Sequence, residues 1–280
     1  MIQSLTLRFS CPQSNQQKFE AALRAFHQLL VIVITKPGRA DEIRRTAAKI
    51  HIAVAFGSTC FTSNLNNFIF QNPTKLIFGK GQIARLSKEL PKNGKILVTF
   101  GGGSVKKNGV YDQVISALEG FDYQEFWGIE PNPKVETLRK AVEICKRDNI
   151  DFLLAVGGGS VLDGTKLIAA AAMIESDAWE LVCNPKLYGG TLPFASVMTL
   201  PATGSEMNRG AVISNLATGE KYAFYNTYPK FSILDPQTTF SLPPYQIACG
   251  LADTFVHVME QYLTVTGVSP LMDRWAEGVL

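Results

Sequence analysis

The stretch "FLLAVGGGSVLDGTKLIAAAAMI", residues 152–174, joins three patterns that each have a known structural meaning. Its first five residues are all apolar, which predicts a short strand that is covered on both faces. Glycine and serine then stop this run, and an apolar helix pattern follows over 161–174. A strand, a tight turn and a helix in this order are typical of one unit of a parallel α/β sheet.

The same order of patterns occurs a second time, upstream. An apolar run at 95–100 is stopped by a second "GGGS" at 101–104, and a helix pattern follows at 111–120. After Pro243 and Pro244 the strand patterns stop, and the chain reads as helix to Leu280. We therefore predict an α/β fold with a parallel sheet, followed by an all-helical domain.

The predicted organisation has three parts. They are an extension of unknown role over 1–65, an α/β domain over 66–240, and the beginning of a helical domain over 241–280.

The composition excludes several classes of protein. With 46% hydrophobic and 18% charged residues, the 280-residue chain can bury a core, and its net charge of +3 is too small to indicate a nucleic-acid partner. The longest apolar run near the start, at 29–34, is far shorter than the ~20 residues that a membrane helix needs. Five widely spaced cysteines without a CxxC pair favour reduced thiols. We expect a cytoplasmic protein without a membrane partner.

The pentapeptide "GGGSV" occurs at 101–105 and at 157–161, each time between a predicted strand and a predicted helix. Glycine lets the backbone turn sharply and approach a ligand closely, and the N–H groups that begin a helix bind phosphate. Ligands of open α/β sheets bind at the carboxyl edge, where both turns are expected. The turns therefore predict phosphate binding, although tight turns also use glycine for steric reasons alone. The spacing differs from the GxGxxG dinucleotide fingerprint.

The first glycine turn continues into "SVKK" and lacks an acid. Many dinucleotide sites have an acid here that accepts the ribose 2′-hydroxyl. In this chain Gly102, Gly103 and Ser104 leave room, and Lys106 and Lys107 add positive charge. This arrangement suits a 2′-phosphate and hence NADP(H) over NAD(H); the alternative is a solvated basic turn.

Two further patterns carry polar groups. The segment "TLPATGSEMNRG" at 199–210 is dense in hydroxyls and amides, which suits either plain turns or a pocket for ribose and nicotinamide. In "LADTFVHVMEQYL", at 251–263, Asp253 and His257 are four positions apart and share one face of the predicted helix. From the residues alone this is either a hydrogen-bonded pair or a pair of metal ligands.

Seven motifs follow one another along residues 66–280. They are "NPTKLIFGKG" (72–81), "TFGGGSVKKNG" (99–109), "EPNP" (130–133), "AVGGGSVLDGTK" (155–166), "TLPATGSEMN" (199–208), "LDP" (234–236) and "GLADTFVHVMEQY" (250–262). In this order they resemble the iron-containing (group III) alcohol dehydrogenases, most closely the NADPH-dependent butanol dehydrogenases and broad-range aldehyde reductases.

The resemblance implies a nucleotide-binding α/β domain, an all-helical domain, and a metal-dependent hydride transfer between NADP(H) and a small aldehyde or primary alcohol. It also implies a homodimer for full-length members. The implied cofactor contacts are Gly102, Ser104 and Lys107 for the 2′-phosphate; Gly158, Gly159 and Ser160 for the pyrophosphate, with Asp163 in the same helix; and Asn132, Thr199, Thr203, Asn208 and Lys221 for adenine, ribose or nicotinamide. Asp253 and His257 correspond to the first two ligands of a divalent metal, Fe²⁺ or Zn²⁺.

This sequence departs from the family in its histidines. A catalytic metal site of this kind needs three or four protein ligands. The family's further histidines are absent, and the chain's own are His27, His51 and His257. Residues 273–280 also lack a helix stop signal. We therefore expect a truncated helical domain, a weakly held metal and impaired activity.

Two rival functions remain. One is an NADP-binding remnant without catalysis. The other is an enzyme like 3-dehydroquinate synthase or glycerol-1-phosphate dehydrogenase, whose phosphorylated substrates require a cluster of basic side chains. Residues 245–280 contain only His257 and Arg274 for that purpose, which disfavours the second rival.

Overall fold

The computed structural model describes residues 71–225, 227–264 and 269–280, so the predicted extension over 1–65 lies outside it. The chain divides into two compact units, one of them Phe70–Leu242 and the other including Pro243–Leu280, and each is described by itself. The strands are β1 (Lys75–Phe78), β2 (Lys95–Phe100), β3 (Asp122–Phe126), β4 (Phe152–Gly158), β5 (Phe194–Leu200), β6 (Gly210–Ser214), β7 (Lys221–Tyr225) and β8 (Phe231–Leu234). The helices are α3 (Leu86–Glu89), α4 (Ser104–Lys107), α5 (Val110–Ala117), α6 (Val135–Asp148), α7 (Gly159–Ala171), α8 (Ala178–Cys183), α9 (Pro244–Thr264) and α10 (Pro270–Val279).

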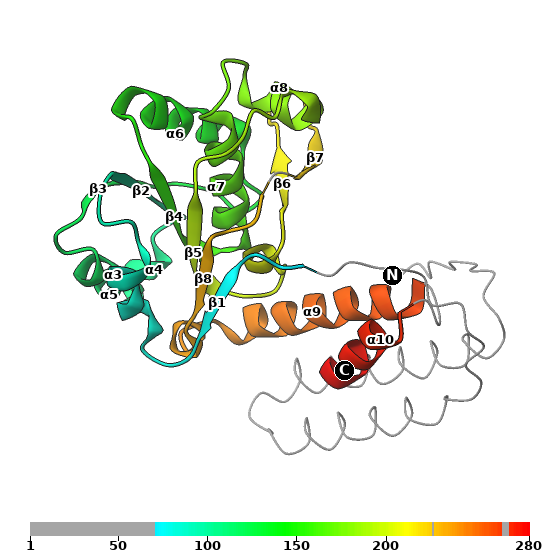
Figure 1. Ribbon diagram of the computed structural model, residues 1–280. Coiled ribbons are helices and arrows are strands. Elements are labelled where there is room, and N and C mark those ends of the chain that lie inside the picture. The colour runs from blue at the N-terminus through cyan, green and yellow to red at the C-terminus, as the bar shows by residue number, and fades with distance from the viewer. Residues whose placement is uncertain (1–70, 226, 265–268) are drawn as a thin grey trace. The chain divides into compact units, whose positions relative to one another are not determined.

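The Phe70–Leu242 unit is built on a six-stranded sheet with the order β1-β8-β5-β4-β2-β3 (Figure 1). All its neighbouring strands are parallel, as the apolar runs predict. Strands β2 and β4 are direct neighbours, and Phe100 pairs with Val156 near their carboxyl ends. Both glycine turns follow these ends, so the prediction that they share the carboxyl edge is confirmed.

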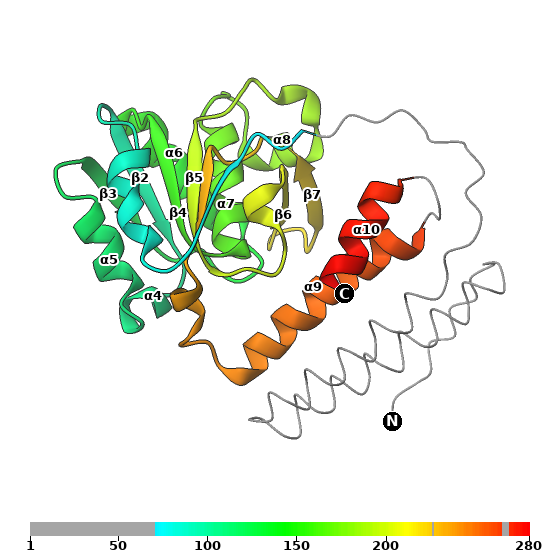
Figure 2. The same cartoon turned by 60° about the horizontal axis from the view of Figure 1, so that its bottom comes forward.

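Helices cover both faces of the sheet. In α6 the residues Val135, Leu138, Ala141, Val142 and Cys145 are buried at intervals of three and four, which forms one apolar stripe. Helices α6, α7 and α8 pack in a core on one face, and α3 and α5 pack in a core on the other (Figures 1 and 2). The predicted α/β architecture is therefore confirmed.

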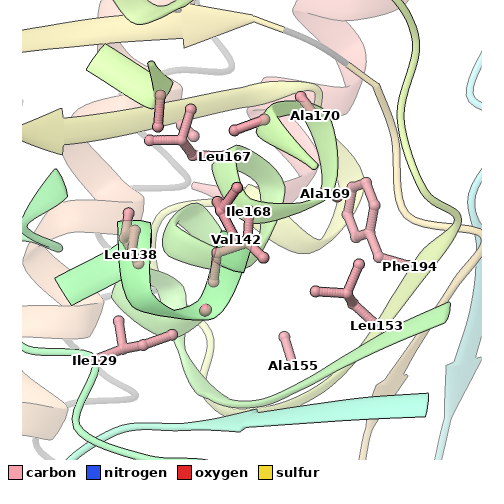
Figure 3. Close-up of a cluster of buried hydrophobic side chains, with 14 of the residues drawn as sticks. Ile129, Leu138, Val142, Leu153, Ala155, Leu167, Ile168, Ala169, Ala170 and Phe194 are labelled. Carbon is pink, nitrogen blue, oxygen red and sulfur yellow. The ribbon is translucent and has the colours of Figure 1, made fainter. Parts of the chain in front are cut away.

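Helix α7 is buried along almost its whole length, in agreement with its mostly apolar sequence. It lies against α6 at Gly164, where a Cβ would be 2.8 Å from Cδ2 of Leu138 and 3.2 Å from Cγ2 of Ile129. Figure 3 shows these two side chains in the same core as Leu167 and Ile168 of α7. The glycine thus permits a close approach between the helices.

An antiparallel hairpin of β6 and β7 is an element that the sequence patterns do not predict. It pairs Gly210 with Tyr225 and Ser214 with Lys221, and it lies beside α7 and α8 (Figure 2). Its apolar side chains, among them Phe224, join the core around α7. Both strands are short, which explains why their alternation is hard to detect in the sequence.

Helices α9 and α10 are the described elements after Leu242, and no strand occurs among the described residues there. The hydroxyl of Tyr262 in α9 donates to Oε1 of Glu277 in α10 at 3.2 Å. Within the described part of the chain, no helix is long and apolar enough to span a membrane. The domain boundary near residue 240 stays a prediction.

Candidate functional site

The two glycine turns lie side by side at the carboxyl edge of the sheet. Cγ2 of Val161 in α7 is 3.3 Å from where a Cβ on Gly101 would lie and 2.6 Å from where one on Gly157 would lie. One valine thus contacts both turns, and a side chain on Gly157 would collide with it. A single extended ligand can therefore contact both turns.

The first turn places Gly103 in the left-handed region, with φ of 92°, directly before α4. Gly102 and Ser104 are exposed, and a Cβ on Gly102 or Gly103 would have nothing within 4 Å. Lys106 and Lys107 in α4 are exposed as well. The predicted 2′-phosphate residues Gly102, Ser104 and Lys107 therefore lie on one open turn.

The second turn begins α7 without a side-chain cap from the described residues. The N–H groups of the first turn of a helix have no partner inside the helix, so those after Gly158 are available to an anion. A Cβ on Gly159 would lie 2.6 Å from Oγ1 of Thr203, so only glycine lets the loop after β5 approach α7 this closely. This contact joins the second glycine turn to the "TLPATGSEMN" segment.

Polar side chains surround the second turn. The N–H of Asn132 donates to Oγ of Ser160 at 3.3 Å, and Oδ1 of Asn132 accepts from Nζ of Lys221 at 2.8 Å. Thr199 is buried near the carboxyl end of β5, and the next residue, Leu200, pairs with Gly158 on β4. Asn132 itself has a positive φ of 55°, which asparagine tolerates better than most residues. These predicted cofactor residues are thus brought together from four separate segments.

Lys166 is a residue of this site that no sequence pattern predicts. Its side chain is fully buried, and Nζ donates to the carbonyl and hydroxyl oxygens of Ser205, both at 2.8 Å. It also contacts the carbonyl and Oδ1 of Asn208, at 3.0 and 3.1 Å, and the carbonyl of Gly210 at 2.6 Å. The signal in the sequence is a single lysine inside the apolar helix pattern.

Two acids accompany this lysine, of which Glu206 is buried and Asp163 is partly buried. Asp163 accepts from Oγ of Ser205 at 2.6 Å and from the N–H of Val212 at 2.9 Å, so it joins α7 to the loop and to the hairpin. Burial raises the pKa of Asp163. Burial also lowers the pKa of Lys166 to about 8, although Asp163 and Glu206 attract its positive charge. Oε2 of Glu206 is buried and has no hydrogen-bond partner within the described chain.

Asp253 and His257 lie on α9, in the other compact unit. Nε2 of His257 is 3.5 Å from Oδ1 of Asp253, and about half of each side chain is exposed. The spacing of four residues therefore places both groups on one face, as predicted. No group of three or more metal-binding side chains occurs among the residues that the structure describes. These residues fit two ligands of a metal site but do not form a complete one.

A family model for iron-containing alcohol dehydrogenases matches residues 73–236, which is more than half of the chain. The chain belongs to this family. The NADPH-dependent aldehyde reductase YqhD of Escherichia coli K12 is 52% identical over 221 residues, which are 77% of this chain and 57% of that protein. The probable NADH-dependent butanol dehydrogenase 1 of Bacillus subtilis is 51% identical over the same shares of the two chains.

Solved structures of the iron-containing alcohol dehydrogenase family have the same fold. The crystal structure of YqhD matches with a TM-score of 0.74 and 51% identity, and it covers 78% of this chain and 57% of YqhD. The NADH-dependent butanol dehydrogenase A of Thermotoga maritima matches with a TM-score of 0.72 and 42% identity, covering 76% of this chain and 55% of that protein. The chain thus spans about 57% of the length of these curated relatives. The family is enzymatic, and its named members are alcohol dehydrogenases and aldehyde reductases.

Proposed function

We propose that this chain binds NADP(H) along the carboxyl edge of its sheet and takes part in hydride transfer between that cofactor and a small aldehyde or primary alcohol. The observation that carries the proposal is the contact of Val161 with both glycine turns, on the adjacent strands β2 and β4. Two turns at the same edge of the sheet offer backbone N–H groups to two separate phosphate groups of a dinucleotide. A cytoplasmic location and a homodimer remain predictions.

The choice of NADP(H) over NAD(H) is supported by the first turn. Gly102 and Gly103 leave open space where an acid would repel a phosphate, and two exposed lysines follow in α4. The names of the relatives do not decide between NADP(H) and NAD(H), because an NADPH-dependent and a probable NADH-dependent protein are about equally similar to this chain.

The residues at the edge have separable roles in this proposal. Gly158, Gly159 and Ser160 receive the pyrophosphate at the start of α7, where the uncapped N–H groups lie. Asn132 and Lys221 are linked to each other and to Ser160, so they hold the neighbouring sugar or ring groups in position. The bound cofactor supplies the hydride that reduces the aldehyde carbon.

Among the described residues, Asp253 and His257 would hold a divalent metal ion, and no third candidate ligand is grouped with them there. In the family the ion would polarise the aldehyde oxygen. The substrate class therefore rests on the family, whereas the cofactor site rests on the residues of this chain.

Binding of the two cofactors to the purified protein tests the proposal. We expect NADPH to bind more tightly than NADH in titrations followed by cofactor fluorescence. Gly158→Val should weaken the binding of NADPH and of NADH by about tenfold or more, because the new side chain crowds the N–H groups that bind pyrophosphate. The matched control is Gly278→Val in α10, where a Cβ would meet nothing within 4 Å. Failure of the wild-type protein to bind either cofactor at millimolar concentration would refute the proposed function.

A further inference from the structure

Helices α9 and α10 carry apolar side chains that are exposed in the part of the chain that the structure describes. In α9, Ile247 and Leu251 are four positions apart and share one side of the helix, and Leu251 is 56% exposed. In α10, Leu271, Met272 and Val279 lie within about 100° of one another around the helix axis, and Val279 is 65% exposed. We call these five residues the apolar faces of α9 and α10.

The described contacts do not account for the stability of these helices. Helix α10 lies beside α9 (Figures 1 and 2), and the hydrogen bond between Tyr262 and Glu277 joins them. Among the described side chains, Ala248 is the buried residue of α9, and none in α10 is buried. Isolated helices shorter than about 12–15 residues are marginal in water, and α10 has ten residues. Exposed apolar surface of this kind indicates a site for another polypeptide segment.

The charge of the two helices restricts what can cover them. Over 244–280 the acids outnumber Arg274, the one residue there with a permanent positive charge, and they are Asp253, Glu260, Asp273 and Glu277. A complementary partner is therefore apolar on one side and basic elsewhere. A second copy of the chain fits poorly, because a two-fold interface brings the same surface of both copies together and opposes acid to acid.

Residues 18–56 lie outside the described chain, and their sequence predicts two amphipathic helices. In 18–30 the large apolar residues recur at intervals of four, three and four, at Phe19, Leu23, Phe26 and Leu30. In 40–56 apolar residues recur at the same intervals, at Ile43, Ala47, Ile50 and Val54. Each pattern gives a helix one apolar side. Neither has a strand or glycine motif that relates it to the cofactor edge.

The same segment is basic and belongs to the same chain. It contains seven lysine and arginine residues and three acids, so its net charge is opposite to that of α9 and α10. The fourteen residues 57–70 connect it to the described residues. A short covalent connection gives such a partner an effective concentration of roughly millimolar, which a second copy has to reach in solution.

We propose that residues 18–56 dock on the apolar faces of α9 and α10, with the apolar side of 18–30 toward the helices. The extension then has a structural role, since it supplies the apolar cover that α10 needs. Its lysine and arginine residues lie against the acids of α9 and α10, which adds specificity to a contact driven by apolar burial.

Zero-length cross-linking of the full chain tests the proposal. A carbodiimide joins a lysine to a carboxylate only where the two side chains touch, so Lys18 or Lys49 should become linked to Glu260 or Glu277. A mixture of unlabelled and isotope-labelled protein shows whether both ends of a link come from one chain. We expect links within one chain. Links found only between differently labelled chains would show that a second copy covers the helices, and this result or the absence of any link to α9 or α10 would overturn the proposal.

Hydrogen exchange with a matched pair of full-chain variants gives a second measurement. Leu23→Asp places a charge on the apolar side of 18–30, and Gln28→Asp places the same charge on the opposite side. Amides of α10 should exchange about tenfold faster in Leu23→Asp than in the wild-type protein, and at the wild-type rate in Gln28→Asp. Amides of β4 should be unaffected in both, which excludes a general loss of folding. Equal exchange of α10 in Leu23→Asp and the wild-type protein would refute docking by this segment.

Discussion

Lys166 shows how much of the site depends on one buried residue. Its ammonium group lies within 3.1 Å of five oxygen atoms of Ser205, Asn208 and Gly210. These residues belong to the loop after β5 and to the start of the hairpin, whereas Lys166 belongs to α7. The lysine therefore ties the loop to the helix that begins at the second glycine turn.

Replacing this lysine should destabilise the fold. Lys166→Met would leave five acceptor oxygens, the buried Glu206 and the partly buried Asp163 without the ammonium group, and we expect the free energy of unfolding to fall by about 3 kcal/mol. Lys140→Met, at an exposed position of α6, is the control and should change it by less than about 0.5 kcal/mol. Urea denaturation measures both. Equal stabilities of the two variants would contradict the role given to Lys166.

The same lysine gives a pH dependence with a definite sign. The pKa of Lys166 is about 8 in the folded chain, against 10.5 for a free side chain. Between these values the unfolded chain holds one more proton than the folded chain, so the free energy of unfolding rises with pH in this window, by on the order of 1 kcal/mol per pH unit. The difference in the free energy of unfolding between the wild-type protein and Lys166→Met should therefore increase from pH 7.5 to pH 9.5. A constant difference would argue against the lowered pKa.

Gly103 offers a test of cofactor choice at a single residue. It has a positive φ of 92° and open space around its missing side chain. Aspartate and asparagine tolerate this backbone better than other side chains and have the same shape, so only the charge separates the two variants. We expect Gly103→Asp to narrow the gap between NADPH and NADH affinities, and Gly103→Asn to change it less. Equal effects in cofactor titrations would show that charge at this turn does not select the cofactor.

At the scale of elements, α9 carries the two predicted metal ligands. The spacing of Asp253 and His257 places both side chains on one face of the helix, where Nε2 of His257 lies 3.5 Å from Oδ1 of Asp253. About half of each side chain is exposed, so water competes with any ion at this position. Two ligands on one helix do not define a coordination geometry.

We therefore expect weak metal binding by the purified chain. Iron and zinc should be well below one ion per chain after gel filtration, measured by elemental analysis. Zn²⁺ titration should show an affinity that His257→Ala and Asp253→Ala both lower, while Glu260→Ala, an exposed acid of the same helix, leaves it unchanged. One tightly held ion per chain that neither substitution removes would mean that other residues bind the metal.

At the scale of the whole molecule, the compact unit Phe70–Leu242 contains both glycine turns and Lys166 with the oxygen atoms that it contacts. The residues of α9 and α10 belong to the other unit. A cofactor bound along the carboxyl edge should therefore stabilise the first unit selectively, because a ligand stabilises only the structure that binds it.

Tryptophan fluorescence can follow that unit alone. Of the three tryptophans, Trp127 and Trp179 lie in Phe70–Leu242, and Trp275 lies in α10. In the Trp275→Phe variant the signal reports the α/β unit, and NADPH at one hundred times its Kd should raise the free energy of unfolding by about 2.7 kcal/mol. NADH at the same concentration should stabilise less. An unchanged unfolding transition with NADPH would contradict binding to this unit.

The sequence by itself determined that a parallel sheet forms, with β2 and β4 among its strands, and it determined both glycine turns and the helices after Leu242. Apolar runs such as 152–156 predict strands buried on both faces, since only a covered parallel sheet buries every side chain of a strand. The spacing in α6, with Leu138 and Val142 on one face, predicts its buried side in the same way. These features depend on local periodicity, which is visible in the sequence alone.

Only the tertiary structure decided which distant residues meet. The lysine of "VLDGTK" and the lysine of "SVKK" look alike in the sequence, yet Lys166 is fully buried among oxygen atoms and Lys106 lies over two aromatic rings. Trp127 reaches the first glycine turn because β3 pairs with β2, and Lys221 reaches Asn132 from 89 positions away. Their environments follow from strand order and helix packing, because the contacts that set burial and charge come from segments far apart in the chain.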